Sequence, residues 1–171
     1  MDMSLIYAVF EAADNKIVGR IRVQKIFYLL EKLGLNGGAR FSYYHYGPYS
    51  ETLANELDFA QLLDNRLDEK IAETQFGASY SIFELAPSKD GTQVDFVGEI
   101  PIESAKQYVK AMKSRTSVAI ELAATIHWLK HEEKVDDWKK ELKKRKPAKA
   151  SQENMSEALR LLDELGLDTK H

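Results

Sequence analysis

Apolar residues recur every three or four positions through most of the chain, which is the spacing of helices that bury one face. The clearest case is residues 20–33, where Val23, Phe27 and Leu30 share a face and Gly34 follows as a left-handed stop. Ser4 and Ser50 are suited to cap helices that follow them. The pattern predicts further helices at residues 4–13, 51–63, 103–113, 117–131, 135–144 and 151–165.

Other segments are extended in character, because they are short and rich in aromatic and β-branched residues. We predict strands at residues 41–46, 67–75 and 80–85, and a further short strand at 94–97. The segment Phe76-Gly77-Ala78-Ser79 joins two of them, so residues 67–85 form a β-hairpin. Residues 15–19 are expected to be a linker, and Gly47-Pro48 to lead into the helix at 51.

These elements define an α+β fold that is mostly helical. Helix, helix, strand, helix and hairpin is the order of a winged helix-turn-helix, so we predict a winged-helix-like core in residues 1–100. Helix 51–63 would take the place of the recognition helix, and the hairpin would be the wing. Residues 101–171 are expected to form a C-terminal helical layer packed on this core, giving one compact unit.

Composition narrows the class of protein. The chain of 171 residues has no cysteine, which excludes disulfides, thiolate catalysis and cysteine metal sites. No apolar run approaches the roughly 18 residues of a membrane helix, and no basic residue precedes the first apolar run as in a signal peptide. We therefore expect a cytoplasmic protein that does not enter a membrane.

The charge on helix 51–63 disfavours standard DNA readout. The segment carries Glu51, Glu56 and Asp58 and has no lysine or arginine. Affinity for DNA depends strongly on basic contacts to phosphate, so this face would be repelled by a duplex.

A basic run later in the chain is the better candidate for binding nucleic acid. It comprises Lys139, Lys140, Lys143, Lys144, Arg145, Lys146 and Lys149. The same run also has a simple structural interpretation, since cations are favoured at the C-terminal end of a helix. Asp136 and Asp137 stand at the other end, where the helix dipole favours acids.

The junction between the second helix and the aromatic strand is the best candidate for a specific site. Its candidate residues are the basic Arg20, Arg22 and Lys25 and the aromatic Tyr44, His45, Tyr46 and Tyr49. They would form a pocket or a protein-contact surface, with the positive end of the helix favouring an acidic partner. We favour a structural interpretation over this one: a solvated basic face beside a strand covered on both sides, whose tyrosines are buried with their hydroxyls hydrogen-bonded.

We find no motif for catalysis or for a cofactor. His127 and His131 have the i, i+4 spacing of a metal pair, but nothing in the sequence brings a third ligand such as His45 or Glu132 to them. Nucleophile, phosphate-loop and dinucleotide motifs are missing. We therefore expect no enzyme, no metal and no cofactor.

Four blocks carry a resemblance to a known family. They are GRIRVQKIFYLLEKLG (19–34), FSYYHYGPYSETLANEL (41–57), SVAIELAATIHWL (117–129) and KRKP (144–147). With these blocks the chain resembles the YwgA-like family of small prokaryotic proteins over most of its length. The first two blocks are also similar to the SocA/Panacea antitoxin domain, although tyrosines replace that domain's tryptophan-containing strand pattern.

The resemblance implies a winged-helix-like core and a role in binding partner proteins. We therefore expect a non-enzymatic protein-interaction module, in its most concrete version an antitoxin-like or defence-system accessory whose partner is a toxin or defence component. The alternative is a winged-helix DNA-binding regulator that uses the 139–149 run or the wing. A homodimer is compatible with either.

Overall fold

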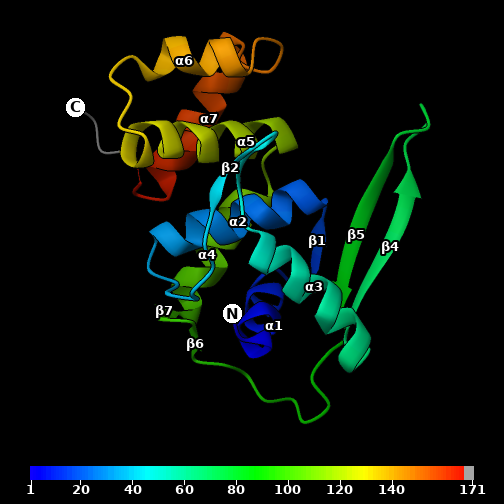
Figure 1. Cartoon of the computed structure of the whole chain (residues 1–171). Helices are drawn as coiled ribbons and strands as arrows, with labels where there is room; N and C mark the ends of the chain where they lie inside the picture. Colours follow the sequence, from blue (N-terminus) through cyan, green and yellow to red (C-terminus); the bar gives the residue numbers. More distant parts are fainter. Residues whose placement is uncertain (168–171) are drawn as a thin grey trace.

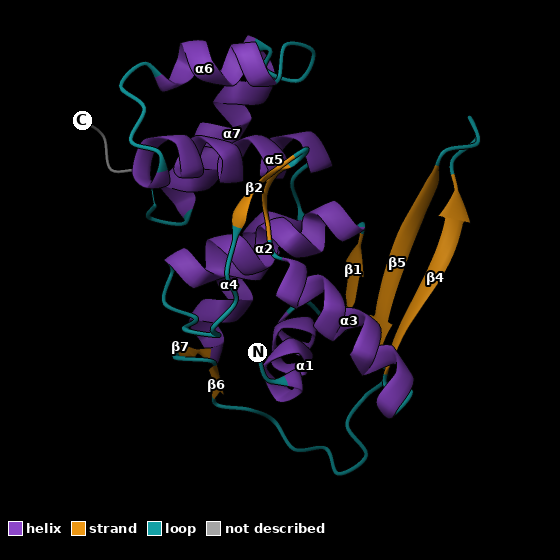
Figure 2. Ribbon diagram, viewed as in Figure 1, coloured by secondary structure: helices purple, strands orange, loops and turns teal. Residues whose placement is uncertain are grey.

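The computed structural model describes residues 1–167 and confirms a mostly helical α+β fold (Figure 2). The helices are α1 (Met3–Ala12), α2 (Arg20–Lys32), α3 (Glu51–Leu63), α4 (Ile102–Lys113), α5 (Ser117–His127), α6 (Trp138–Arg145) and α7 (Gln152–Glu164). A π-helical turn, η1 (Trp128–Glu132), continues α5. The strands are β1 (Lys16–Val18), β2 (Ser42–Tyr44), β3 (Gly47–Tyr49), β4 (Leu67–Glu73), β5 (Ser79–Leu85), β6 (Phe96–Val97) and β7 (Ile100–Pro101).

The predicted hairpin at 67–85 is confirmed as β4 and β5, which stand to one side of the helices (Figure 1). The sheet has a third strand, because β1 pairs antiparallel with β5 and places Ile17 opposite Phe83. Residues 15–19 are therefore not only a linker. A three-residue strand is too short to show a periodic pattern, although Ile17 is fully buried.

The strand predicted at 41–46 is instead the first arm of a hairpin, the β2–β3 turn (residues 42–49). Tyr44 pairs with Gly47 and Ser42 with Tyr49, so the chain reverses at His45-Tyr46. Gly47 has a φ of 91°, a conformation that favours glycine. Gly47-Pro48 thus forms the second arm, and Ser50 then caps α3 by accepting a hydrogen bond from the Leu53 amide at 3.1 Å.

Some helix ends differ from the sequence prediction because other residues cap them. Asp2, not Ser4, caps α1. Its carboxylate accepts a hydrogen bond from the Ser4 backbone amide at 2.9 Å. The helix predicted at 135–144 begins at Trp138. Asp137 is its N-terminal cap, because the Asp137 side chain accepts a hydrogen bond from the backbone amide of Lys140.

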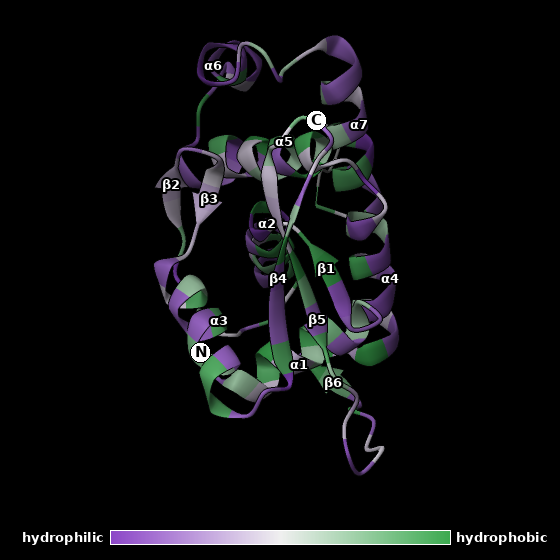
Figure 3. Ribbon diagram, turned by 90° about the vertical axis from the view of Figure 1, so that its right-hand side faces the viewer, coloured by the Kyte–Doolittle hydropathy of each residue, from purple (hydrophilic) through white to green (hydrophobic). Residues whose placement is uncertain are grey.

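One apolar core joins the two halves of the chain. Helix α5 packs against α2 and α7, and α4 packs against α1 and α2. Apolar residues gather on the inner sides of these helices (Figure 3), and Phe10, Phe27 and Leu122 are fully buried among them. The last four residues of the predicted layer, 168–171, lie outside the described part. Across residues 1–167, no helix has the length and apolar character needed to cross a bilayer.

The end of α5 holds a buried histidine. The Tyr28 hydroxyl lies 3.0 Å from Nδ1 of His127, within hydrogen-bonding distance. Burial, with a smaller effect from His131, lowers the pKa of His127 from 6.5 to about 4. The neutral form is therefore built into the fold.

This histidine should make the fold sensitive to acid. Between pH 6.5 and 4 the unfolded chain binds a proton at residue 127 that the folded chain does not. The stabilisation present above pH 6.5 is therefore lost as the pH falls, by roughly 3 kcal/mol in total. His127→Gln should flatten the pH dependence of the unfolding free energy in this window, measured by urea titration, and the exposed His131→Gln should not. Parallel pH profiles for wild type and His127→Gln would contradict the assignment.

Candidate functional site

A pocket of about 250 Å³ lies between the start of α2, the β2–β3 turn and α3. Six of the seven residues predicted for this junction line it, and Arg22 is the exception. The full lining consists of Arg20, Ile21, Gln24, Lys25, Tyr44, His45, Tyr46, Tyr49, Ala54 and Leu57. The structure thus brings these six residues together at a pocket, as in the interpretation that the sequence analysis did not favour, and adds the apolar Ile21, Ala54 and Leu57.

Aromatic rings form one wall of the pocket. The Tyr44 and Tyr49 rings are stacked with centroids 5.4 Å apart, and the His45 ring meets Tyr44 edge-on at 4.7 Å. Tyr44 is 56% exposed and Tyr46 is 50% exposed. These rings are therefore available to a partner, and the expectation of a strand buried on both faces is wrong for them.

Buried polar groups of α2 fix the turn beneath these rings. The Gln24 side chain makes two hydrogen bonds to the backbone of Ser50, donating to its carbonyl at 2.9 Å and accepting from its amide at 2.8 Å. Lys25 is 1% exposed, and its ammonium donates to the carbonyl of Pro48 at 2.6 Å. Burial lowers the pKa of Lys25 to about 8. The pocket wall is thus held from the inside.

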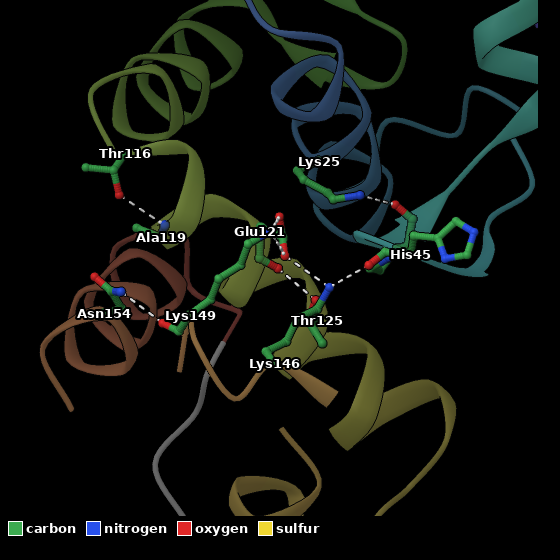
Figure 4. Close-up of polar contacts among 10 residues, drawn as sticks. Lys25, His45, Thr116, Ala119, Glu121, Thr125, Lys146, Lys149 and Asn154 are labelled. Atoms are coloured by element: carbon green, nitrogen blue, oxygen red, sulfur yellow. Dashed lines mark hydrogen bonds and ion pairs between the residues drawn. The ribbon is translucent and has the colours of Figure 1, made fainter. Parts of the chain in front are cut away.

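A buried ion cluster fixes the same turn from the side of α5 (Figure 4). We call Glu121, Lys146 and Lys149 the Glu121 cluster. Glu121 is 2% exposed, and its carboxylate lies 3.0 Å from the Lys146 ammonium and 2.9 Å from that of Lys149. Lys146 also donates to the backbone carbonyl of His45 at 2.9 Å, while the His45 imidazole points away from it. The Lys149 ammonium lies 4.9 Å from the centre of the Tyr46 ring.

The two predicted arginines are engaged in the fold. Arg20 donates to the Glu69 carboxylate at 2.6 and 2.7 Å and to Asp58 at 2.9 Å, which joins α2 to β4 and α3. Arg22 donates to the carbonyls of Val18 and Arg115, both at 2.9 Å, and so points away from the pocket. The prediction of Arg22 as a contact residue is therefore not supported by its position.

The basic run at 139–149 divides into two groups. Lys139, Lys140, Lys143 and Lys144 are exposed on and beside α6. Arg145 is paired with Glu133 and Glu141 at 2.8 Å, and Lys146 is buried in the Glu121 cluster. The first group is free to meet an external phosphate backbone, whereas Arg145 and Lys146 drop out of the predicted nucleic-acid surface. Lys149 is paired with Glu121 but keeps its side chain 35% exposed.

The histidine pair does not form part of a metal cluster in the described chain. The rings of His127 and His131 lie 4.5 Å apart, but Nδ1 of His127 is bonded to Tyr28. Within residues 1–167, no three His, Asp or Glu side chains are grouped so that they could hold a metal ion.

Fold and site together define a small α+β protein with a pre-formed aromatic pocket on its surface. Comparison with known proteins adds two similar sequences. The chain is 25% identical over 152 residues to the uncharacterized protein YwgA of Bacillus subtilis (strain 168), covering 89% of each chain. This similarity confirms the predicted relationship to YwgA-like proteins. No protein-family profile matches the sequence, and the likeness to the SocA/Panacea domain stays a prediction.

A second relative corrects the expectation about catalysis. The chain is 30% identical over 144 residues to a Thermus aquaticus (strain ATCC BAA-2747 / Y51MC23) protein named DNA ADP-ribosyl glycohydrolase. The similarity covers 78% of this chain but 37% of that protein. We expected no enzyme because no catalytic motif was found. That exclusion is wrong, since a similar protein bears the name of an enzyme and the missing motifs are no ground for ruling catalysis out.

Removing the charge of Glu121 should strongly destabilise the protein. Glu121→Gln keeps the shape of the side chain but leaves two lysines in a buried site without their counter-charge. We expect a loss of about 3 kcal/mol in unfolding free energy, because breaking one side of a buried ion pair leaves an uncompensated charge. The matched control is Glu153→Gln, at an exposed position on α7, measured in the same denaturant titration. Equal effects of the two substitutions would show that the buried lysines do not depend on Glu121 for their counter-charge.

Proposed function

We propose that this protein is a protein-interaction module that binds a partner at the pocket beside the β2–β3 turn. The observation that carries the proposal is the pair of half-exposed tyrosines, Tyr44 and Tyr46, on a turn whose backbone is held by Gln24, Lys25 and Lys146. Binding energy at protein interfaces concentrates in aromatic residues around well-packed pockets. A rigid wall also reduces the entropy lost on binding.

The size of the pocket supports a side chain as its occupant. Sites for drug-sized molecules usually measure about 300–1,000 Å³. At about 250 Å³ the pocket lies below that range and is suited to one anchoring side chain. Ile21, Ala54 and Leu57 contribute apolar surface to it, so the anchor should be apolar or aromatic.

The charges of α3 support a protein partner over a duplex at this position. The order of α2, α3 and the β4–β5 hairpin, with β1 added to the sheet, is compatible with the winged-helix-like core that we infer. In such a core α3 would face the DNA, yet Glu51 and Asp58 are exposed on it and no basic residue lies within it. An antitoxin-like or defence-accessory role is one version of this proposal and rests on the resemblance to SocA/Panacea.

Substitution of the exposed tyrosines tests the proposal. Tyr46→Ala should weaken capture of the main partner from the native host by at least tenfold in quantitative mass spectrometry, because an anchor in a pocket contributes about 2 kcal/mol or more. Phe76→Ala is the matched control, since Phe76 is exposed at the tip of the β4–β5 hairpin, far along the chain from the turn. Equal loss with both variants, or no loss with either, would refute binding at this pocket.

A second candidate function is binding to nucleic acid through α6. It is favoured by the four exposed lysines at 139, 140, 143 and 144, and by a relative whose name refers to DNA. Release of counterions from DNA would make the affinity fall steeply as salt increases.

This second candidate predicts a specific salt dependence. Lys139→Ala combined with Lys143→Ala should weaken duplex binding and reduce the slope of log affinity against log salt by about 2, because two phosphate contacts are lost. The pair Lys106→Ala and Lys110→Ala, on exposed positions of α4, is the control. Binding to a labelled duplex is measured by fluorescence anisotropy. If wild type shows no measurable affinity for the duplex at low salt, nucleic-acid binding is eliminated as a function.

A further inference from the structure

Positive charge exceeds negative charge in the buried region behind Tyr46. Within the described chain, the ammonium groups of Lys146 and Lys149 contact the carboxylate of Glu121, and the Lys25 ammonium is near enough for all three charges to act on it. Burial is the main cause that lowers the pKa of Lys25. The Glu121 carboxylate opposes it without cancelling it, and the charges of Lys146 and Lys149 lower the pKa further by smaller amounts. A further anion would therefore be favoured here, since desolvated cations lack the screening of bulk water.

The Lys149 side of this region is open to solvent. The Lys149 side chain is 35% exposed, whereas those of Lys146 and Glu121 are 6% and 3% exposed. Two hydrogen bonds from Lys149 reach Glu121, at 2.9 and 3.1 Å. An ammonium group has three donors, so one N–H of Lys149 remains for an incoming acceptor.

Tyr46 connects this cationic region to the pocket. Its ring lines the pocket, and the ammonium groups of Lys149 and Lys146 lie 4.9 and 6.0 Å from its centre. The opposite wall of the pocket is α3, which carries Glu51, Glu56 and Asp58. Of these acids, Asp58 is paired at 2.9 Å with Arg20, and α3 reaches the pocket itself through Ala54 and Leu57. The ammonium of Lys149 is therefore the charge beside Tyr46 that would orient a ligand.

We infer that the partner presents an apolar or aromatic side chain to the pocket and a neighbouring carboxylate to Lys149 beside Tyr46. This inference rests on the proposed function and specifies its partner as an acidic segment of protein. The carboxylate would bind on the Lys149 side of Tyr46, and a basic residue at the same place would be repelled.

A double-mutant cycle tests this inference with defined peptides. The probes are short acetylated, amidated peptides in which a Phe is followed by Asp after zero, one or two glycines, each matched with an Asn peptide. Binding is measured by amide chemical-shift changes at constant ionic strength. The best Asp peptide should bind wild type about fivefold more tightly than its Asn match, as for a partly exposed charge-assisted hydrogen bond. This ratio should fall to nearly one in Lys149→Gln, and persist in Lys149→Arg and in the control Lys106→Gln, at an exposed position of α4.

The outcomes separate this inference from the proposed function. Equal binding of Asp and Asn peptides, with affinity still dependent on Tyr46, overturns the acidic partner and leaves the pocket as a protein site. No binding of any Phe peptide up to millimolar concentration overturns both. Adenosine monophosphate, tested in parallel, is the probe for a nucleotide. Its binding at Tyr46 and Lys149 in preference to the peptides would replace the acidic segment with a nucleotide ligand.

Discussion

The buried carboxylate of Glu121 is the interaction on which the arrangement of the site depends. It lies on α5 and holds Lys146 and Lys149, which follow α6, while Lys146 also holds the carbonyl of His45. One carboxylate thereby connects three segments that are far apart in the sequence. Such a cluster is expensive to desolvate, and removing one member costs more than the whole cluster contributes. Its main effect is therefore to fix one relative position of the turn and the C-terminal helices.

The pocket is rigid because the β2–β3 turn is held on two sides. Lys25 and Gln24 bond its second arm and the residue that follows, and a side chain at Gly47 would place its Cβ 2.5 Å from Oγ1 of Thr125 on α5. The glycine thus allows both the positive φ and the close approach to α5. Polar contacts at the tip and the second arm hold the backbone and leave the rings of Tyr44 and Tyr46 as the exposed part of the turn.

The sequence predicted the helices, and which residues meet where α2 adjoins the aromatic segment, more accurately than the exposure of the tyrosines or the environment of individual charges. Periodic apolar stripes such as that of Val23, Phe27 and Leu30 depend on local spacing, and they gave α2 within a residue at its end. The strand at 41–46 was misjudged because Gly47-Pro48 suits a turn before α3 as well as the second arm of a hairpin. Lys146 lies in a run of lysines that look alike in sequence. Only tertiary contacts with Glu121 and His45 distinguish it from exposed neighbours such as Lys144.

The two candidate binding surfaces, the pocket and the lysines of α6, are connected through Lys146 and Lys149. The lysines of α6 and the pocket are not independent surfaces, because α6 leads directly into Lys146 and Lys149. A ligand that displaced the Lys149 ammonium would change the ion pairs of Glu121. Because Lys146 bonds both Glu121 and the carbonyl of His45, the position of the pocket wall would change with them. The Glu121 cluster is thus one physical route by which binding at one surface would change affinity at the other, and any such coupling must be reciprocal. The cluster is both the support of the pocket and a physical connection between it and α6.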